Sequence, residues 1–404
     1  MISLFKKGDR RQCENYRGIS LLNSIYKLYA RIINKRLKII TENLIGEEQS
    51  GFRKGRSTSD NIFILQQILE KRSEYNLQTH IAFIDFQKAF DNVEREKLWI
   101  IMKEQGYPRQ LIKVVKNLYE ETKIVLNFRT EKSEEILTNK GVRQGCPMSP
   151  TLFNIYINNI IQNWKQKIDA GIKITRGKIL NILLYADDVV LIQETEDDLQ
   201  RSIHHLHQIC QNYNIEISKE KTKVMANWGK IPIRSKIVVD DKIIEQVSSF
   251  NYLGCEISTE KDKDTEKKLT RFQMICGTIH NTLKNKTRPD TRMKFYNTMA
   301  IPTLLYGCES WVPTQRTTNR IQSCEMKFLR KTKGCTREDR IRNEEIRKEL
   351  EAEAVNSRMD RYRKRWLQHV GRMEDTRLPK LAFQYAPKGK RDVGRPRTRW
   401  KETL

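Results

Sequence analysis

The residues of this chain best suited to chemistry are two adjacent aspartates, Asp187 and Asp188, in the segment Ile179–Gln193. Apolar runs over 182–184 and 189–192 flank the tetrad Tyr-Ala-Asp-Asp that contains them. Short apolar runs around a tight polar link predict a β-hairpin within a packed sheet. Adjacent carboxylates in such a place repel each other and are costly to desolvate unless a cation lies between them. The pattern therefore indicates either half of a metal site or an ordinary polar turn, because aspartate is also a common turn residue.

A third carboxylate, Asp85, lies inside the apolar stretch Ile81–Phe86, which we expect to be a buried strand. An acid at such a position is typical of a functional site, although a buried ion pair with Lys or Arg would also explain it. The three aspartates could meet if their strands are neighbours in one sheet. Carboxylates and waters are ligands that Mg²⁺ prefers. Two Mg²⁺ ions about 3.5–4 Å apart, with Mn²⁺ as an alternative, would activate an attacking 3′-oxygen and stabilise a leaving pyrophosphate, which is nucleotidyl-transfer chemistry.

The elements that must position these aspartates are predicted from apolar periodicity and from Gly and Pro. After the first aspartate we expect one helix over residues 88–104 and another over 110–121. The Gly/Pro-rich turn 141–150 should open an apolar helix over 151–161. In that turn an Arg-Gln pair would be free to hydrogen-bond a ligand. Together these segments predict a mixed α+β fold around the hairpin.

Composition points to a polyanionic partner. The 404 residues include 76 Lys and Arg against 50 Asp and Glu, a net charge of +26. Such an excess most often indicates nucleic acid, with a basic surface kept only for solubility as the alternative. No apolar stretch approaches the length needed to span a bilayer, and the N-terminus lacks the features of a signal peptide. The eight cysteines form no CxxC pair, so we expect neither a zinc module nor a disulfide-linked oligomer, and we predict an intracellular protein of the nucleus or cytoplasm.

The C-terminal part differs in composition from the rest. A helical stripe begins at Asp262, and Tyr296–Leu305 continues it with an interruption at Pro302. Residues 358–401 then hold fifteen Lys and Arg against four Asp and Glu. We expect this basic region to contact phosphates. The short Gly394–Pro396 match to a minor-groove AT-hook is weak.

These motifs closely resemble the reverse transcriptases of non-LTR (LINE-type) retrotransposons, and the resemblance covers nearly the whole chain. Seven blocks in the family order carry it: FKKGD with NYRGISLLNSIYKLYARIINKRL, QSGFRKGRST, FIDFQKAFDNV, GVRQGCPMSPTLFNIYIN, LLYADDVVLI, KEKTKVM and FNYLG. The resemblance implies a right-hand polymerase with fingers, a palm built on an antiparallel sheet, a thumb and a helical basic C-terminal region. The implied boundaries are 1–74 for the fingers, 75–258 for the palm, 259–335 for the thumb and 336–404 for the C-terminal region, with 1–258 as the reverse transcriptase domain.

The resemblance also implies roles for individual residues. Asp85, Asp187 and Asp188 match the catalytic metal-binding carboxylates, and the carbonyl of Phe86 is a further candidate metal ligand. Lys221 matches a proposed general acid that protonates pyrophosphate, with an exposed lysine of no such role as the alternative. The positions that match nucleotide-contacting residues of the family are Lys7 (or Lys6), Arg17, Gln144 and Gly145.

Two further matches concern the sugar and the primer. Phe90 stands where related enzymes place an aromatic ring that excludes a ribose 2′-hydroxyl, although packing in a helix core would also explain it. The segment that resembles the primer grip consists of Phe250, Asn251, Tyr252, Leu253 and Gly254. The helices after it resemble a thumb that tracks an A-form duplex by its backbone.

The resemblance predicts an RNA-directed DNA polymerase that uses an RNA template, a DNA primer or target and dNTPs. Relatives usually carry an endonuclease ahead of the polymerase, and this chain begins almost inside the fingers. We therefore expect a truncated element copy that lacks the endonuclease. The alternative is a catalytically inactive relic that only binds RNA or DNA.

Overall fold

The computed structural model describes residues 1–6, 8–128, 131–229, 231–258, 260, 262–283, 287–389, 391 and 398–403. Lys7 and the Gly394–Pro396 motif lie outside these described residues. The chain divides into two compact units. The first unit comprises Met1–Ser57, His80–Met225 and Arg234–Gln246, and the second comprises Thr58–Thr79, Ala226–Ile233 and Val247–Leu404.

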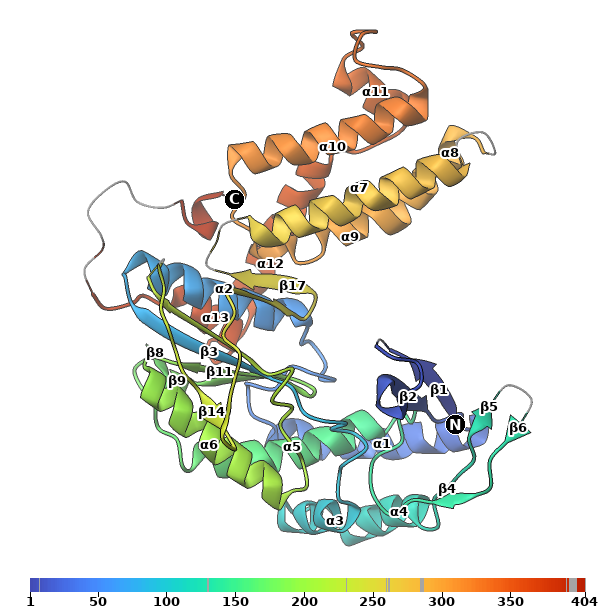
Figure 1. The fold of residues 1–404 in the computed structure, drawn as a ribbon, viewed down its shortest axis with the longest axis vertical. Coiled ribbons are helices and arrows are strands. Elements are labelled where there is room, and N and C mark those ends of the chain that lie inside the picture. The colour runs from blue at the N-terminus through green and yellow to red at the C-terminus, as the bar shows by residue number, and fades with distance from the viewer. Residues whose placement is uncertain are drawn as a thin grey trace. The chain divides into compact units, whose positions relative to one another are not determined.

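The centre of the first unit is a sheet with strand order β10-β11-β3-β12 (Figure 1). Its strands are β10 (Ile182–Tyr185), β11 (Asp188–Gln193), β3 (Gln78–Ile84) and β12 (Lys223–Trp228). β11 pairs antiparallel with both β10 and β3, which confirms the expected mixture of helices with an antiparallel sheet. The apolar runs of β3, β10 and β11 are buried almost throughout, as strands covered on both faces should be. β12 runs on into the second unit, where it pairs with β13 (Ile231–Pro232).

Helices complete the core of the first unit. They are α1 (Ser24–Leu44), α3 (Arg95–Glu104), α4 (Arg109–Tyr119), α5 (Ser149–Lys165) and α6 (Glu196–Asn212). α5 packs against α3, α1 and α6, and α6 packs against β11 (Figure 1). The α6 helix begins after Thr195, whose side chain accepts a hydrogen bond from the Asp198 N–H and so satisfies an N-terminal donor.

The helix expected over residues 88–104 is wrong in its first half. It begins only at Arg95, and Lys88 adopts a left-handed φ of 45° that a right-handed helix does not accommodate. The Asp91 and Asn92 N–H groups both donate to the Lys88 carbonyl oxygen instead, forming a tight turn. This turn carries Phe90 out of the helix on which the sequence placed it.

Short strands lie around this core. Within the first unit they are β1 (Ile2–Phe5), β2 (Tyr16–Ile19), β4 (Lys123–Ile124), β5 (Asn127–Phe128), β6 (Glu131–Lys132), β7 (Ile136–Leu137), β8 (Ile172–Thr175), β9 (Lys178–Leu180), β14 (Val238–Val239) and β15 (Lys242–Ile243). β1 and β2 form an antiparallel hairpin in which Leu4 pairs with Arg17. That register sets Arg17 beside the end of β1, where Lys6 follows.

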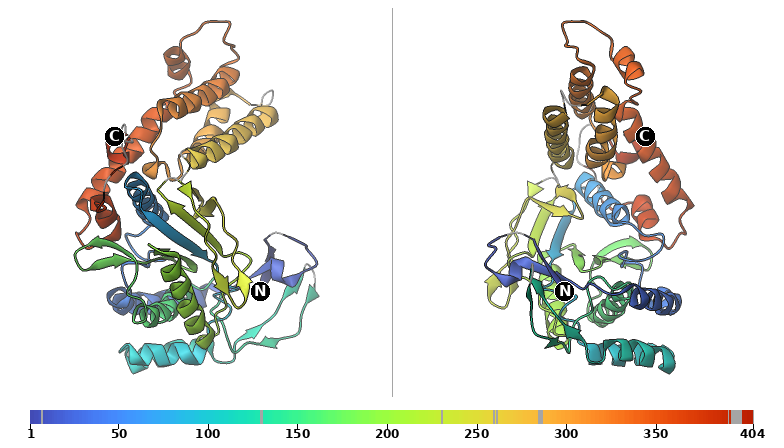
Figure 2. Two further views of the ribbon diagram at one scale, coloured as in Figure 1. Left: turned by 60° about the vertical axis from the view of Figure 1, so that its left-hand side comes forward. Right: turned by 90° about the vertical axis from the view of Figure 1, so that its right-hand side faces the viewer.

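The second unit is mainly helical. Its helices are α2 (Thr58–Glu74), α7 (Lys263–Leu283), α8 (Pro289–Phe295), α9 (Ile301–Leu305), α10 (Gln315–Lys333), α11 (Asn343–Glu349), α12 (Val355–Arg372) and α13 (Leu378–Gln384). α7 and α10 run side by side (Figures 1 and 2), and their apolar faces form a buried core around Phe272, Tyr296 and Leu329. A hairpin of β16 (Ser249–Tyr252) and β17 (Cys255–Ser258) precedes them. A π-helical turn, Tyr296–Ala300, leads directly into α9. Pro302 lies in the first turn of α9 and has no N–H to donate, which explains the helix interruption predicted at this proline.

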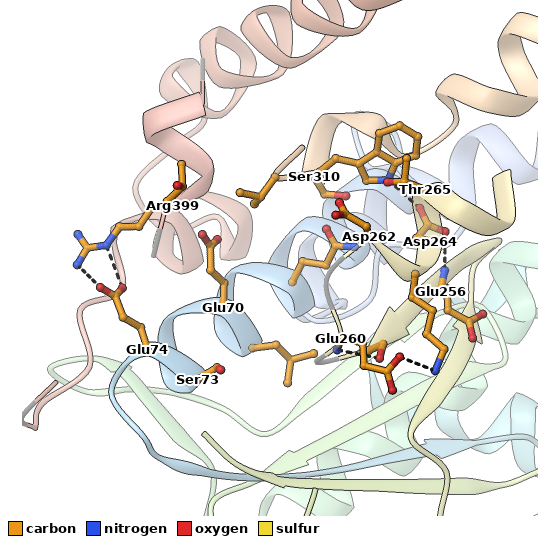
Figure 3. Close-up of a pocket in the computed structure, with 17 residues that line it drawn as sticks. Glu70, Ser73, Glu74, Glu256, Glu260, Asp262, Asp264, Thr265, Ser310 and Arg399 are labelled. Carbon is orange, nitrogen blue, oxygen red and sulfur yellow. Dashed lines mark hydrogen bonds and ion pairs between the residues drawn. The ribbon is translucent and has the colours of Figure 1, made fainter. Parts of the chain in front are cut away.

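A cavity of about 160 Å³ lies within the second unit (Figure 3). Its acidic lining is largely paired with protein groups. Asp264 accepts hydrogen bonds from the Trp311 indole at 2.7 Å and from Lys268 Nζ at 2.6 Å. Glu74 accepts two hydrogen bonds from the Arg399 guanidinium, drawn as dashed lines in Figure 3. These pairings give the acids a structural role.

Two further properties bear on the expectations. Every cysteine of the chain lies in the described part, and all eight are free thiols. Among the described residues, no helix is both long enough and apolar enough to cross a membrane.

Candidate active site

A cavity of about 1670 Å³ within the first unit gathers most of the residues that the sequence singled out. They come from the residue that follows β1, from β2, the turn after β3, the 141–150 turn, the β10/β11 hairpin and the segment before β12. The predicted site residues among its lining are Lys6, Arg17, Asp85, Phe86, Phe90, Gln144, Gly145, Asp187 and Lys221. Asp188 is not among the described residues that line it.

The sheet register brings two aspartates to the same place. Tyr185 pairs with Asp188, so Ala186 and Asp187 form a two-residue turn at the end of the hairpin. Val189 pairs with Ile84, which puts the end of β3 beside that turn. Asp85 comes directly after the last residue of β3, whereas the sequence pattern predicted it inside the strand.

Backbone contacts hold Asp85 at this end of the sheet. The Ser218 N–H donates to the Asp85 carbonyl oxygen at 2.8 Å, and the Asp85 N–H donates to Thr222 Oγ1 at 3.3 Å. Lys221 lies on the same short segment, and its Nζ is 3.5 Å from Asp85 Oδ1. Lys221, the candidate general acid, and Asp85, the candidate metal ligand, are thus adjacent in the cavity wall.

Carboxylates repel one another at this site. Burial and the nearby Asp85 raise the pKa of the Asp187 carboxyl above its usual range. Partial burial, together with Asp187 and Asp85, raises the pKa of Asp188 to about 6. Asp188 keeps part of its surface in solvent at the start of β11. Asp85 therefore acts electrostatically on both Asp187 and Asp188, although only Asp85 and Asp187 line the cavity.

Positive charge stands nearby. Burial, with Arg17 and Lys221 next to it, lowers the pKa of the Lys6 ammonium. Asp85 acts in the opposite direction and favours the charged form of Lys6. The cavity thus holds separate acidic and basic groups within electrostatic reach, an arrangement suited to a ligand with a polyphosphate and a bound cation.

The donor set fits a hard divalent cation in its chemistry. Mutually repelling carboxylate oxygens are stabilised by a cation such as Mg²⁺ or Mn²⁺, which prefers oxygen ligands. In the described part of the chain, no three His, Cys, Asp or Glu side chains are grouped closely enough to hold a metal ion without rearrangement. The case for a divalent cation at this site therefore rests on the oxygen donors and on the electrostatic repulsion among the aspartates.

Phe90 is held between two other aromatic rings. Its ring stacks on Phe153 at a centroid distance of 4.4 Å with the planes 13° apart. Phe52 approaches it edge-on at 6.3 Å and also lines the cavity. Phe52 itself has a φ of 61°, an uncommon conformation for a bulky residue. Phe52 was missed at the sequence level, although it follows the glycine of the QSGFRKGRST block.

Arg143 and Gln144 were expected to be free to bind a ligand, but both side chains have hydrogen-bond partners within the protein. The Arg143 guanidinium donates to Tyr26 Oη at 2.7 Å and to Thr122 Oγ1 at 3.0 Å. Gln144 Nε2 donates to Asp91 Oδ1 at 3.0 Å. Arg143 is therefore tied into the scaffold, and Asp91, which the sequence did not single out, orients Gln144.

Glycine is required at Gly145. Its φ is 109°, and an added Cβ would lie 2.8 Å from the Ser20 carbonyl oxygen. The Ser20 N–H donates to the Gln144 carbonyl at 2.8 Å, so the two segments pack backbone against backbone. A side chain at this position would push the turn away from the segment that follows β2.

The predicted primer-grip residues belong to the second unit, in the β16/β17 hairpin. Tyr252 is buried and its Oη accepts a hydrogen bond from Asn61 Nδ2 at 3.2 Å. Leu253 and Gly254 form the turn with φ of 48° and 81°, and the Tyr306 hydroxyl donates to the Leu253 carbonyl at 2.9 Å. These contacts define a fixed hairpin.

Comparison with known proteins agrees with the motifs. The family model for reverse transcriptase (RNA-dependent DNA polymerase) matches residues 5–257. The probable RNA-directed DNA polymerase from transposon BS of Drosophila melanogaster is 26% identical over 89% of this chain and 40% of its own length. The corresponding X-element protein of Drosophila melanogaster is 25% identical over 92% of this chain and 42% of its own length.

The Xenopus laevis transposon TX1 protein of 149 kDa is 29% identical over 63% of this chain and 20% of its own length. The chain thus spans less than half the length of these curated relatives. Among solved structures, apo telomerase from Candida Tropicalis aligns with a TM-score of 0.45 and 12% identity, over 88% of this chain and 56% of that one. Because the family model covers more than half of the sequence and the relatives come from mobile elements, this chain belongs to the reverse transcriptase (RNA-dependent DNA polymerase) family and is of the non-LTR retrotransposon type.

Proposed function

We propose that this chain is an RNA-directed DNA polymerase that adds dNTPs to a primer 3′-hydroxyl under the direction of an RNA template. The observation that carries the proposal is the content of one cavity, where Asp85 and Asp187 stand with Lys6, Arg17 and Phe90. Carboxylates can hold metal ions, the cations can bind a triphosphate, and the flat ring can screen the sugar.

Each kind of group has a separate task. Lys6 and Arg17 bind the triphosphate and offset the charge that develops on it in the transition state. Phe90 lies under the sugar and leaves no room for a 2′-hydroxyl. Lys221 donates a proton to the departing pyrophosphate as general acid, and Gln144 and Gly145 border the incoming nucleotide.

Asp85, Asp187 and Asp188 would hold two Mg²⁺ ions, with the Phe86 carbonyl as a further ligand. When bound, such ions lower the charge on the reacting oxygens and favour attack by the 3′-hydroxyl. The aspartates themselves contribute by standing at the end of the sheet, where the strand register sets their spacing.

The other parts of the chain would serve the template and primer. Residues 1–74 would act as fingers, 75–258 as palm and 259–335 as a thumb on the duplex. The Phe250–Gly254 hairpin would grip the primer end, and the basic region 336–404 would contact phosphates. An intracellular setting follows from these partners.

Primer extension tests the proposal directly. Purified protein with poly(rA)/oligo(dT), dTTP and Mg²⁺ should lengthen the primer, and an Asp187→Asn/Asp188→Asn variant should not. Extension by that variant at the wild-type rate would refute the catalytic assignment.

The net charge of +26 supports a second candidate, a relic that binds nucleic acid without catalysis. Duplex binding measured across a salt series separates the two, because phosphate contacts alone give a steep salt dependence. Binding of that kind without extension by the wild-type chain would favour the relic.

A further inference from the structure

The turn that carries Asp187 has a backbone conformation that needs support. Ala186 precedes Asp187 and adopts a φ of 58°, a region that glycine, Asn and Asp enter more readily than alanine. Ala186 is nonetheless buried. Its peptide groups therefore require protein partners, since water does not reach them freely.

A single buried side chain, Gln49, supplies those partners. Gln49 Oε1 accepts a hydrogen bond from the Ala186 N–H at 3.0 Å, and Gln49 Nε2 donates to the Ala186 carbonyl at 3.3 Å. The same Oε1 also accepts from the Gly51 N–H at 2.8 Å. Both peptide groups of Ala186 are thus held by one amide, which is the group that offers an acceptor and a donor together.

The backbone around Gln49 is itself fixed to β10. The Leu184 N–H donates to the Glu48 carbonyl at 2.8 Å, and the Ser50 N–H donates to the Leu184 carbonyl at 2.9 Å. These two bonds form an isolated parallel β-bridge between Gln49 and Leu184 of β10.

A close approach at Gly51 and three hydrogen bonds keep this segment near the turn. An added Cβ at Gly51 would lie 2.2 Å from the Ala186 nitrogen, so only glycine allows the approach. Asn154 on α5 donates to the Gly51 carbonyl at 2.8 Å. Arg53 donates to the Gln49 carbonyl at 3.1 Å and to the Gly46 carbonyl at 2.6 Å. Gln49 therefore stands on a frame that is anchored on both sides.

We propose that Gln49 is a positioning residue for the catalytic centre: it fixes the left-handed Ala186 and thereby the place of the Asp187 carboxylate. This inference rests on the proposed polymerase function. Gln49 makes no contact with the aspartate carboxylates, so its effect passes through the turn backbone. Without the amide, the turn relaxes and the Asp187 oxygens move away from Asp85.

Loss of the Gln49 amide should affect cation binding and the chemical step specifically. A misplaced ligand weakens the site for Mg²⁺, whereas Lys6, Arg17 and the nucleic-acid surface stay in place. For Gln49→Ala we expect kcat to fall about 10²-fold, the order expected for a displacement of about 1 Å. The Mg²⁺ concentration for half-maximal activity should rise, while the KM for dNTP and the affinity for duplex stay near wild type.

A matched control separates positioning from stability. Gln193 is a second buried glutamine and lies within the hairpin itself, at the far end of β11 from the Ala186 turn. Its Nε2 donates to Ser202 Oγ at 2.7 Å. Gln193→Ala should lower the melting temperature as Gln49→Ala does, but it should leave the Mg²⁺ dependence unchanged. Gln49→Glu keeps an oxygen acceptor for the two N–H groups and should recover part of the activity.

Two measurements do not depend on extension. Mn²⁺ binding to the full chain, followed by electron paramagnetic resonance, should weaken in Gln49→Ala and not in Gln193→Ala. Amide hydrogen exchange in the peptide that contains Ala186 should speed up in the same variant only. If Gln49→Ala and Gln193→Ala change these readouts equally, or neither changes them, the inference is wrong.

Failure of the Gln49 inference can be distinguished from failure of the proposed polymerase function. A wild-type chain that extends no primer refutes the polymerase proposal, while Mn²⁺ binding and hydrogen exchange still decide the role of Gln49. A wild-type chain that extends primers, with a Gln49→Ala variant that matches it in rate and Mg²⁺ dependence, refutes the inference alone.

Discussion

The ring of Phe90 stacks on the ring of Phe153, with centroids 4.4 Å apart and planes 13° from parallel. Phe153 is fully buried on α5, so it gives Phe90 a fixed support at the wall of the cavity. A residue that screens the sugar must resist displacement by the larger substrate, and a stacked aromatic pair supplies that stiffness.

Shortening this side chain should change sugar selection. For Phe90→Val we expect rNTP incorporation relative to dNTP to rise by about 10–200-fold, the range over which pocket shape discriminates. Single-nucleotide extension with paired rNTP and dNTP titrations measures it. Phe153→Leu, which removes the stacking partner and leaves the Phe90 side chain in place, should give a smaller rise. A loss of stability with unchanged discrimination would make Phe90 a packing residue.

Lys221 lies 3.5 Å from the Asp85 carboxylate, and its removal should affect the chemical step. For Lys221→Ala we expect kcat to fall about 10²-fold, as is usual for the loss of a general acid. Lys223 is a suitable control, because it is paired with Glu245 at 2.6 Å. Lys223→Ala should retain wild-type kcat; an equal loss in both variants would indicate a general effect of charge.

Divalent cations should stabilise the fold as well as support activity. Burial and the neighbouring aspartates disfavour the ionised forms of Asp187 and Asp188, and a bound Mg²⁺ ion would relieve that repulsion. The stabilisation should reach about 2.7 kcal/mol at a Mg²⁺ concentration 100 times the dissociation constant. Thermal unfolding with Mg²⁺ and with EDTA measures it. The Asp187→Asn/Asp188→Asn variant should melt at the same temperature in both; a shift equal to wild type would place the ions elsewhere.

Arg95 should be the most sensitive position of the scaffold around the 141–150 turn. Its guanidinium donates to the backbone carbonyls of Tyr119, Thr138, Lys140 and Gly141. Because Arg95 is buried, Arg95→Met leaves several of these oxygens unpaired, and we expect the free energy of unfolding to fall by about 3 kcal/mol or more. Denaturant titration checks this, with exposed Lys103→Met on the same helix as control. A change below that of Lys103→Met would contradict it.

Gly51 should tolerate no side chain. In Gly51→Ala the new methyl would stand 2.2 Å from the Ala186 nitrogen, so the hairpin turn has to shift. We expect a loss of Mg²⁺-dependent extension similar to that of Gln49→Ala. Gly277→Ala is the control, since Gly277 has no positive φ and an added Cβ there meets nothing within 4 Å. Equal losses in the two variants would contradict a specific effect of the Gly51 methyl on Ala186.

The sequence by itself determined the candidate site residues and the coarse fold. Adjacent aspartates between apolar runs, a third aspartate after another apolar run and a large excess of basic residues all depend on local pattern and composition. The hairpin and the helices at 110–121 and 151–161 followed from the same patterns, because apolar periodicity reflects which face is buried. The antiparallel sheet was implied by the family resemblance. The seven ordered blocks added the family.

Tertiary structure decided how those residues are held. The helix expected from residue 88 begins at Arg95, because a left-handed Lys88 turns the chain and carries Phe90 toward Phe153. Arg143 is tied to Tyr26 rather than free. Gln49 reaches Ala186 across 137 positions of sequence. Local periodicity contains no information on such contacts, since they depend on strand register and on which loops the sheet brings together. The types of candidate site residue could therefore be predicted from the chain, whereas the residues that support them could be found only in three dimensions.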